Sequence, residues 1–374
     1  MYRLLIFLLI LCVSCEKKTT TTPLDNALQS QHPAIKKVMD NPEGHEIQIL
    51  YSQIDTNEDG ETVFTDYNFQ LNNQNYFYPA STVKLPAAIL ALEFTDNTTF
   101  LSPEIDYIIE GDTILHNFND DVRQIFAVSD NEAYNRLYEF LGRDFINNQL
   151  RTKKISPVRI GHRIETENAA EQERKKIKFL TKRNVSIKKD GSLESIYVEK
   201  TLKGKGFMKD SALVSEPMDF SEKNYYPLKA QHNTIKRLFF EKSFAILERF
   251  NLSPASKIYL KNVMSNPPRK LGYDKDKFND SFGKFFIYGD SQDNIPEGMK
   301  IYNKVGYAYG TITETAYIED TVNDVKFILS ATILVNENGI FNDDEYEYEE
   351  IGIPFLAQLG REIYMHEMKR KTVN

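Results

Sequence analysis

The chain has few cysteines and histidines, the residues that most often bind transition metals or, for cysteine, form disulfide bonds. It contains no HExxH or CxxC motif, and its six histidines are scattered through 374 residues, so we predict no metal and no other cofactor. Its two cysteines, Cys12 and Cys15, both lie near the N-terminus. Acidic residues outnumber basic ones, and the net charge of −8 argues against nucleic acid as a general partner. No internal repeat is visible, and 374 residues are enough for one large domain or two closely packed ones.

The apolar run at the N-terminus is too short to cross a bilayer. It spans residues 4–13 and ends at Ser14-Cys15, as in the core of a secretory signal peptide. A cysteine directly after a small residue at this point is typical of a bacterial lipoprotein cleavage site. We therefore predict a signal peptide over residues 1–14, a lipid on Cys15, and a lipid-anchored location in the cell envelope, facing the periplasm. No cysteine would then remain for a disulfide. Ordinary secretion with an unmodified Cys15 is the alternative.

The rest of the chain divides into a polar segment and a domain. Residues 15–43 are predicted to be a tether, and residues 44–370 the domain. Apolar periodicity indicates strands near both ends of the domain and helices between them. The predicted fold class is therefore α+β, with an antiparallel sheet from the N- and C-terminal segments and a helical middle subdomain. A lysine-rich stretch at about 170–210, with Asp190-Gly191 as a turn signal, is predicted to be a basic hairpin insertion with a solvated face. The predicted strands are 46–54, 63–71, 300–307, 310–319 and 325–335, and the predicted helices are 80–94, 131–141, 239–250, 256–264 and 350–369.

Ser81 and Lys84 are three residues apart in the string Ser81-Thr82-Val83-Lys84. On a helix this spacing places both side chains on one face. A lysine amine in that position can take the proton of the serine hydroxyl and make it a nucleophile. Near a helix N-terminus, the dipole and the free backbone N–H groups also favour a developing oxyanion. Taken alone the string is common by chance, and Ser81 could be only a helix cap.

Two further motifs follow along the chain. Ser129-Asp130-Asn131 precedes a predicted helix, where the Ser129 hydroxyl could pass a proton to a leaving group and the Asn131 amide could bind substrate. A plain helix cap is the other interpretation. Lys304-Val305-Gly306 lies on a predicted strand, and a strand glycine marks either a bulge or the close approach of a ligand. The three motifs together, in this order, favour a catalytic site.

These strings resemble the three signatures of the class A β-lactamase and penicillin-binding serine hydrolase family, which are SxxK, SDN and K-[TS]-G on an edge strand. The likeness continues around the motifs, over residues 129–142, 251–264 and 304–318, and extends over roughly 45–370 outside the basic insertion. It implies the fold of that family. It also implies acyl transfer through a covalent serine intermediate that water then releases.

The resemblance assigns a role to each matched residue. Ser81 would be the nucleophile, Lys84 its activator and Ser129 the proton shuttle. Asn131 would orient Lys84 and the substrate, and Lys304 would attract the substrate carboxylate. The backbone N–H groups of Ser81 and Tyr307 would form the oxyanion hole. The implied substrate-binding positions are therefore Asn131, Lys304, Gly306 and Tyr307.

Two positions depart from the family pattern. Val305 stands where the family has Thr or Ser, whose hydroxyl helps to hold the substrate carboxylate. The family's deacylating carboxylate is best matched by Glu165, although the spacing from Glu165 to Asn168 is one residue short. A surface carboxylate paired with nearby lysines is the alternative for Glu165.

The sequence thus predicts a lipid-anchored serine hydrolase with β-lactamase-type activity. Its partners would be a β-lactam or a peptidoglycan-like peptide and, through the lipid, the membrane. A DD-peptidase or esterase on the same fold is one alternative. A penicillin-sensing or scaffold lipoprotein that is acylated without turnover, or not at all, is another.

Overall fold

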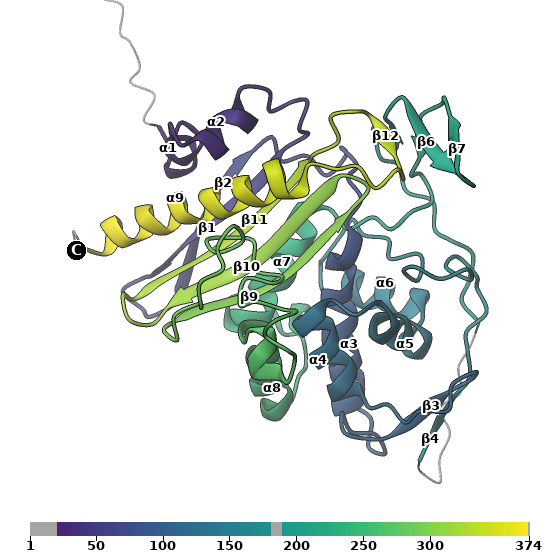
Figure 1. Cartoon of the computed structure of the whole chain (residues 1–374). Helices are drawn as coiled ribbons and strands as arrows, with labels where there is room; N and C mark the ends of the chain where they lie inside the picture. Colours follow the sequence, from purple (N-terminus) through teal and green to yellow (C-terminus); the bar gives the residue numbers. More distant parts are fainter. Residues whose placement is uncertain (1–20, 181–188, 373–374) are drawn as a thin grey trace, which may run out of the picture.

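The chain folds around one five-stranded antiparallel sheet, seen in a computed structural model that describes residues 21–180 and 189–372. The strand order is β2-β1-β11-β10-β9, so the N-terminal hairpin pairs with the C-terminal strands through β1 and β11 (Figure 1). The α+β class and the five predicted strands are confirmed. Their bounds are β1 Gln48–Thr56, β2 Thr62–Phe69, β9 Met299–Ala308, β10 Thr311–Asp320 and β11 Val325–Leu334.

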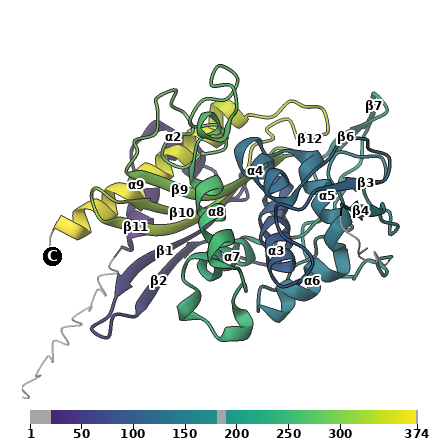
Figure 2. The same cartoon turned by 90° about the horizontal axis from the view of Figure 1, so that it is seen from below.

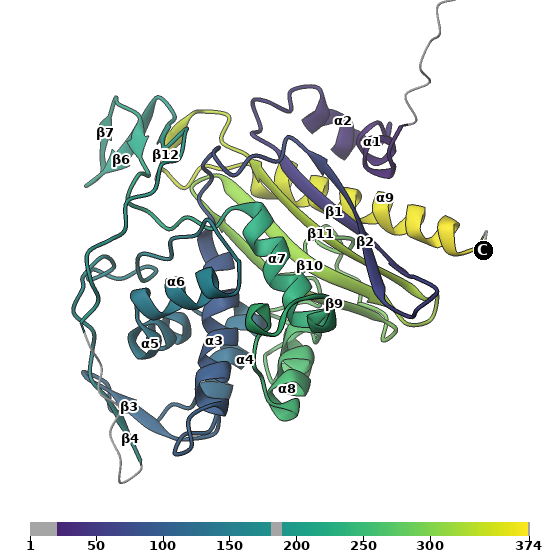
Figure 3. The same ribbon diagram turned by 180° about the vertical axis from the view of Figure 1, so that it is seen from behind.

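Helices cover both faces of this sheet. The long C-terminal helix α9 (Ile353–Thr372) lies along one face, and α7 (Leu228–Phe239) lies across the other (Figures 1 and 3). Each face has its own apolar core because both faces of the central strands are covered. None of the helices within the described residues is long and apolar enough to cross a bilayer.

Beside the sheet lies a helical subdomain that packs around α3 (Lys84–Asp96). Eleven residues of α3 are buried, so it has no polar face and sits at the centre of its neighbours (Figure 2). Its buried N-terminus points at the sheet, at the level of β9 and β10. The surrounding helices are α4 Phe118–Val128, α5 Asn131–Leu141, α6 Arg143–Thr152 and α8 Pro254–Ser265.

The tether predicted over residues 15–43 is wrong from residue 23 onwards. Two short helices, α1 (Pro23–Leu28) and α2 (Pro33–Met39), pack against α9 and bury Leu24, Ile35 and Val38. Each helix has a proline in its first turn and a side-chain cap, so short polar segments were enough to form them. The predicted signal peptide and Cys15 lie outside the described residues.

The helix predicted over residues 239–250 is also wrong. Helix α7 ends at Phe239 and is followed by two 3-10 turns, Glu241–Ser243 and Ile246–Glu248. The aromatic residues at its end pack on the sheet next to Tyr317, whereas Ile246 is 80% exposed, so the apolar spacing does not belong to one buried face. The helices α4 and α6 were not predicted at all.

The hairpin predicted around Asp190-Gly191 falls partly on residues outside the described part of the chain, and the described residues 189–198 form no strand. Instead the Asp190 carboxylate accepts the backbone N–H groups of Arg143 (3.1 Å) and Asp144 (3.3 Å), and so caps α6, which begins after a glycine. Residues 181–188 lie outside the described part.

The remaining short strands form three small sheets, in which β3 pairs with β4, β5 pairs with β8, and β12, β6 and β7 follow one another in that order. Their bounds are β3 Tyr107–Ile109, β4 Ile177–Phe179, β5 Leu202–Lys203, β6 Gly206–Lys209, β7 Ala212–Val214, β8 Met218–Asp219 and β12 Ile340–Phe341.

Candidate active site

Ser81 lies at the start of the central helix. It belongs to a 3-10 turn, Ala80–Val83, that runs directly into α3 at Lys84. Ala80, just before it, has a left-handed backbone with φ of 46°, which is strained for a residue with a side chain. The backbone N–H of Ser81 is one of the first in the helical segment and therefore has no partner one turn earlier. The predicted proximity of Ser81 to a helix N-terminus is thus observed.

Gly306 lets strand β9 pass directly beside Ser81. A Cβ atom on Gly306 would lie 2.7 Å from the Ser81 backbone nitrogen and 2.7 Å from the Pro79 carbonyl oxygen. Such contacts are too short for any side chain, so the close approach requires glycine. The glycine therefore acts by its lack of a side chain.

Tyr307 follows at the edge of the sheet. The hairpin between β9 and β10 turns at Tyr309 and Gly310, both with positive φ, and Ala308 pairs with Thr311 to close it. Hydrogen-bonded and non-hydrogen-bonded pairs alternate in an antiparallel ladder, so the N–H of Tyr307 points away from β10. The backbone N–H groups of Ser81 and Tyr307 are therefore both available to one oxyanion.

Lys84 is buried beneath the SDN motif. Its Nζ donates to the carbonyl oxygen of Ser129 and to Oδ1 of Asn131, and lies 3.4 Å from the Ser129 hydroxyl. Ser129 adopts φ of 57° at the end of α4, which turns its carbonyl toward the amine. Burial lowers the pKa of Lys84 to about 7, although the carboxylates of Asp130 and Glu165 favour the charged form. The amine can therefore act as a base near neutral pH.

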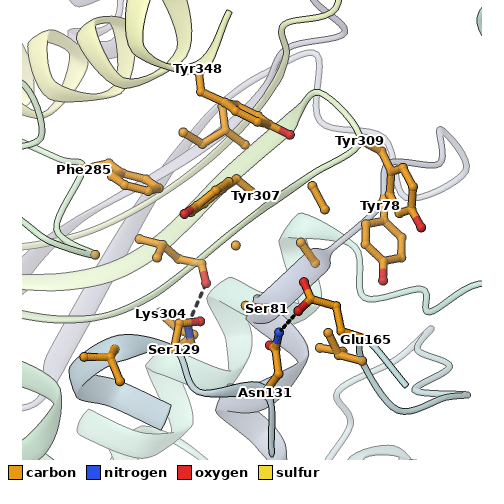
Figure 4. A pocket seen from close by; sticks show the side chains of 18 of the residues that line it. Tyr78, Ser81, Ser129, Asn131, Glu165, Phe285, Lys304, Tyr307, Tyr309 and Tyr348 are labelled. Carbon is orange, nitrogen blue, oxygen red and sulfur yellow. Dashed lines mark hydrogen bonds between the residues drawn. The ribbon is translucent and has the colours of Figure 1, made fainter. Parts of the chain in front are cut away.

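Lys304 approaches the same serine from the strand. Its Nζ is 2.8 Å from the Ser129 hydroxyl and 2.9 Å from the Val305 carbonyl oxygen (Figure 4). Burial and the nearby Lys84 amine both hold the pKa of Lys304 well below its usual value. The Ser129 hydroxyl thus lies between two amines, as a proton relay requires.

Glu165 reaches the cleft from the segment after β-bridge residue Arg159. Its carboxylate accepts the Asn131 side-chain amide at 2.6 Å, and its backbone is left-handed with φ of 48° (Figure 4). Asn168 does not share this position, because its side chain contacts the Thr166 hydroxyl at 2.7 Å instead. The shorter spacing in the sequence therefore has a structural consequence: one polar group expected beside Glu165 is turned away.

Helix α5 holds the segment that carries Glu165. The buried Arg163 guanidinium makes two hydrogen bonds to the Glu139 carboxylate, at 2.6 and 2.9 Å. The Asn135 side chain bonds both the N–H and the carbonyl of Ile164, at 2.9 and 2.8 Å. These charge-assisted and paired contacts fix the backbone directly before Glu165.

Sequence reasoning singled out Tyr307 only for its backbone N–H and did not identify the aromatic walls of the cleft. The cleft has a volume of about 1410 Å³ and contains Ser81, Asn131 and Glu165. One wall is formed by Tyr78 and Tyr309, and another by Tyr307, which lies between Phe285 and Tyr348 (Figure 4). Two signals were present, because Tyr78 stands three residues before Ser81 and Tyr307 directly follows the strand motif.

Val305 lies beside the cleft but its side chain belongs to the apolar core. It is 5% exposed and clusters with Phe285 and Ile312, on the face of β9 opposite Lys304. The residue therefore supplies no polar group to a substrate. Within the described residues, no group of three or more His, Cys, Asp or Glu side chains is placed to bind a metal ion.

Comparison with known proteins agrees with this geometry. Residues 32–187 match the beta-lactamase enzyme family. Among solved structures, the TLA-3 extended-spectrum β-lactamase is 12% identical with a TM-score of 0.55, covering 92% of this chain and 98% of that one. A class A β-lactamase from Bacteroides cellulosilyticus DSM 14838 is 12% identical, with a TM-score of 0.53 over 92% and 97%. The L2 structure complexed with relebactam is 15% identical, with a TM-score of 0.52 over 92% and 98%.

The family match and the structural matches cover different lengths of the chain. No curated protein sequence matches the chain, and identities this low establish a shared fold. The structural matches span nearly the whole chain, beyond the segment that the family match covers. Residues 32–187 therefore match the β-lactamase enzyme family, and the chain as a whole has the fold of the class A enzymes.

Proposed function

We propose that the protein is a serine hydrolase that opens β-lactams through a covalent acyl-enzyme on Ser81. The observation that carries the proposal is the Lys84 amine, with a pKa lowered to about 7, one helical turn from Ser81 and bonded to Ser129 and Asn131. The family match and the fold support the same reaction class.

In the acylation step, neutral Lys84 takes the proton of the Ser81 hydroxyl as its oxygen attacks the lactam carbonyl carbon. The negative charge on the carbonyl oxygen is stabilised by the N–H groups of Ser81 and Tyr307. The C–N bond then breaks, and the Ser129 hydroxyl gives its proton to the leaving nitrogen. Ser129 recovers a proton from the protonated Lys84, which lies 3.4 Å from its hydroxyl. Lys304, 2.8 Å away, holds that hydroxyl in place.

In the deacylation step, Glu165 takes a proton from water, and the resulting hydroxide attacks the ester carbonyl. The ester bond to Ser81 breaks, and the serine oxygen recovers the proton that Glu165 took from the water, so that both groups return to their starting state. Asn131 orients Glu165 through the 2.6 Å contact with its carboxylate. Both ends of the Asn131 amide are used, because its oxygen accepts from Lys84.

A labelling time course with a fluorescent penicillin tests the proposal. The wild-type protein should be labelled and the label should decay, whereas Ser81→Ala should never be labelled and should keep its thermal unfolding temperature. Label on Ser81→Ala, or a wild-type protein that is never labelled, would contradict the assignment. If Glu165 activates the water, Glu165→Gln should form the label at the normal rate and retain it.

The orientation of Asn168 favours a second candidate, a penicillin-binding sensor in which the acyl-enzyme persists. With Asn168 turned toward Thr166, one water ligand expected from the family pattern is missing. In the same time course, this function would give a lasting label in the wild-type protein. A DD-peptidase or esterase would instead turn over peptide or ester substrates faster than the penicillin.

We also propose that Cys15 anchors the protein to the cell envelope by a lipid, facing the periplasm. The support is the sequence pattern at residues 4–15. Metabolic labelling with a radioactive fatty acid should mark the wild-type protein and not Cys15→Ser. Equal labelling of both would contradict the anchor.

A further inference from the structure

Tyr78 is held rigidly at the wall of the cleft. Its ring stacks on His162, with 6.4 Å between centroids and 8° between planes. Tyr309 meets it edge-on at 5.1 Å, and Phe220 packs at 6.1 Å. The residue is only 7% exposed. Its ring therefore has one position, and its hydroxyl has one direction.

That hydroxyl faces the cleft on the side of Glu165 (Figure 4). Over residues 21–180 and 189–372, it makes no hydrogen bond with a protein atom, although buried tyrosines normally have a partner. Burial, the neighbouring Tyr309 and the Glu165 carboxylate all raise the pKa of Tyr78, so the phenol keeps its proton. A protonated hydroxyl in this place must donate to something inside the cleft.

We propose that the Tyr78 hydroxyl donates a hydrogen bond to the water that Glu165 deprotonates, and so replaces the group lost by the reorientation of Asn168. The inference rests on the proposed function of Ser81 and Glu165. The water gives one proton to the Glu165 carboxylate, accepts the Tyr78 hydrogen bond on one lone pair and attacks with the other. Its oxygen bonds to the acyl carbon, the bond from that carbon to Ser81 breaks, and Tyr78 retains its own proton throughout.

The local geometry favours water over substrate as the acceptor. Tyr78 is next to Glu165, and the Ser129–Lys304 pair that serves the leaving nitrogen lies on the other side of Ser81 (Figure 4). A donor that serves only the water affects deacylation and leaves acylation unchanged. A slower deacylation with unchanged acylation therefore distinguishes a catalytic hydroxyl from one that only supports the fold.

The test is the rate of label formation and decay in Tyr78→Phe, which removes the hydroxyl and keeps the ring stack. Label should form at the wild-type rate within about twofold, and decay ~10- to 100-fold more slowly, the range expected for one hydrogen bond to a developing charge. In Glu165→Gln, adding Tyr78→Phe should slow decay no further, since the two groups act on one water. Wild-type decay in Tyr78→Phe, or an additive loss in the double variant, would overturn the inference.

Tyr134→Phe is the matched control. Its hydroxyl donates to the carbonyl of His162 at 3.2 Å, so it supports the same segment without reaching the cleft. Decay in this variant should stay within about twofold of wild type. Equal slowing in Tyr134→Phe and Tyr78→Phe would assign the effect to a loosened segment and overturn the inference. Decay unchanged in Tyr78→Phe, with a wild-type protein that labels and releases, would leave the proposed function intact. A wild-type protein that is never labelled would overturn both.

Discussion

Two lysines are buried on opposite sides of strand β9, and they have different partners. On the cleft side, the Lys84 amine contacts a carbonyl, an amide oxygen and a hydroxyl, and no carboxylate bonds it within the described residues. On the core side, the Lys284 amine contacts the carbonyl oxygens of Met264 and Ile301, the latter at 2.8 Å, and Oδ1 of Asn303 at 2.6 Å.

A buried carboxylate completes the core-side network. Glu314, on β10, accepts the backbone N–H of Phe286 at 2.6 Å and the side-chain amide of Asn303. Burial lowers the pKa of Lys284 and raises that of Glu314, and each group opposes the shift of the other. Asn303 thus connects a closed acid–base pair that ties β9 to β10 and to the chain before it.

The difference between the two sides indicates what each lysine can do. The network around Lys284 is saturated and buried, so its charge state can change little without disturbing the core. The Lys84 amine donates hydrogen bonds to polar neighbours, and Lys84 lies one helical turn after Ser81. The same type of side chain at similar depth is therefore structural in one place and reactive in the other. Variants of the two lysines and the pH profile of acylation test this division.

Lys84→Ala should have the largest effect on chemistry. Without its base, acylation of Ser81 should fall by at least ~10³-fold, as when one member of a catalytic unit is removed. The fold should survive, because the variant removes a buried amine rather than one half of an ion pair. Label formation and thermal unfolding measure the two effects separately. Acylation within tenfold of wild type would remove Lys84 from the mechanism.

Lys284→Met should have its main effect on stability. It leaves Glu314 buried without its cation, and breaking a buried pair costs about 3–5 kcal/mol of the free energy of unfolding. Folded molecules should still be labelled at close to the wild-type rate. Denaturant unfolding measures the loss, and adding Glu314→Gln should recover part of it. A stable Lys284→Met variant that fails to be labelled would reverse the comparison.

The pH dependence of acylation should follow Lys84. A lysine with a lowered pKa is protonated below that pKa and neutral above it, and only the neutral amine is a base. Because burial lowers the pKa of Lys84 to about 7, the rate of label formation should rise about tenfold from pH 6 to pH 8 and then level off. Stopped-flow labelling measures the profile. A rate that is flat over this range would show that another group is the base.

Val305→Thr should have the smallest effect. A hydroxyl there could help to hold a substrate carboxylate, but the side chain lies in the apolar cluster with Phe285, where an unpaired hydroxyl costs about 1–3 kcal/mol. We expect a gain of less than about tenfold in acylation, limited to substrates that carry the carboxylate. Paired esters with and without the carboxylate measure it. An equal change for both esters would show that residue 305 does not face the substrate.

The motifs predicted the reacting groups because their spacing is local. Ser81 and Lys84 share a helix face by being three residues apart, and Ser129 and Asn131 flank a helix start, so secondary structure alone orients them. The sheet was predictable for a similar reason, since alternation along each strand reflects its burial. The catalytic roles of these residues remain predictions for the labelling experiments.

Other features depended on contacts between distant segments. Residues 23–39 look like a polar linker until α9 provides a surface for Leu24, Ile35 and Val38. The direction of the Tyr78 hydroxyl depends on His162 and Tyr309, and the pairing of Lys284 with Glu314 depends on the register of β9 and β10. Local sequence determined which reactive groups this protein has. Only tertiary packing decided which are desolvated, which are paired and which face the cleft, because burial and neighbouring charges come from residues far away in the chain.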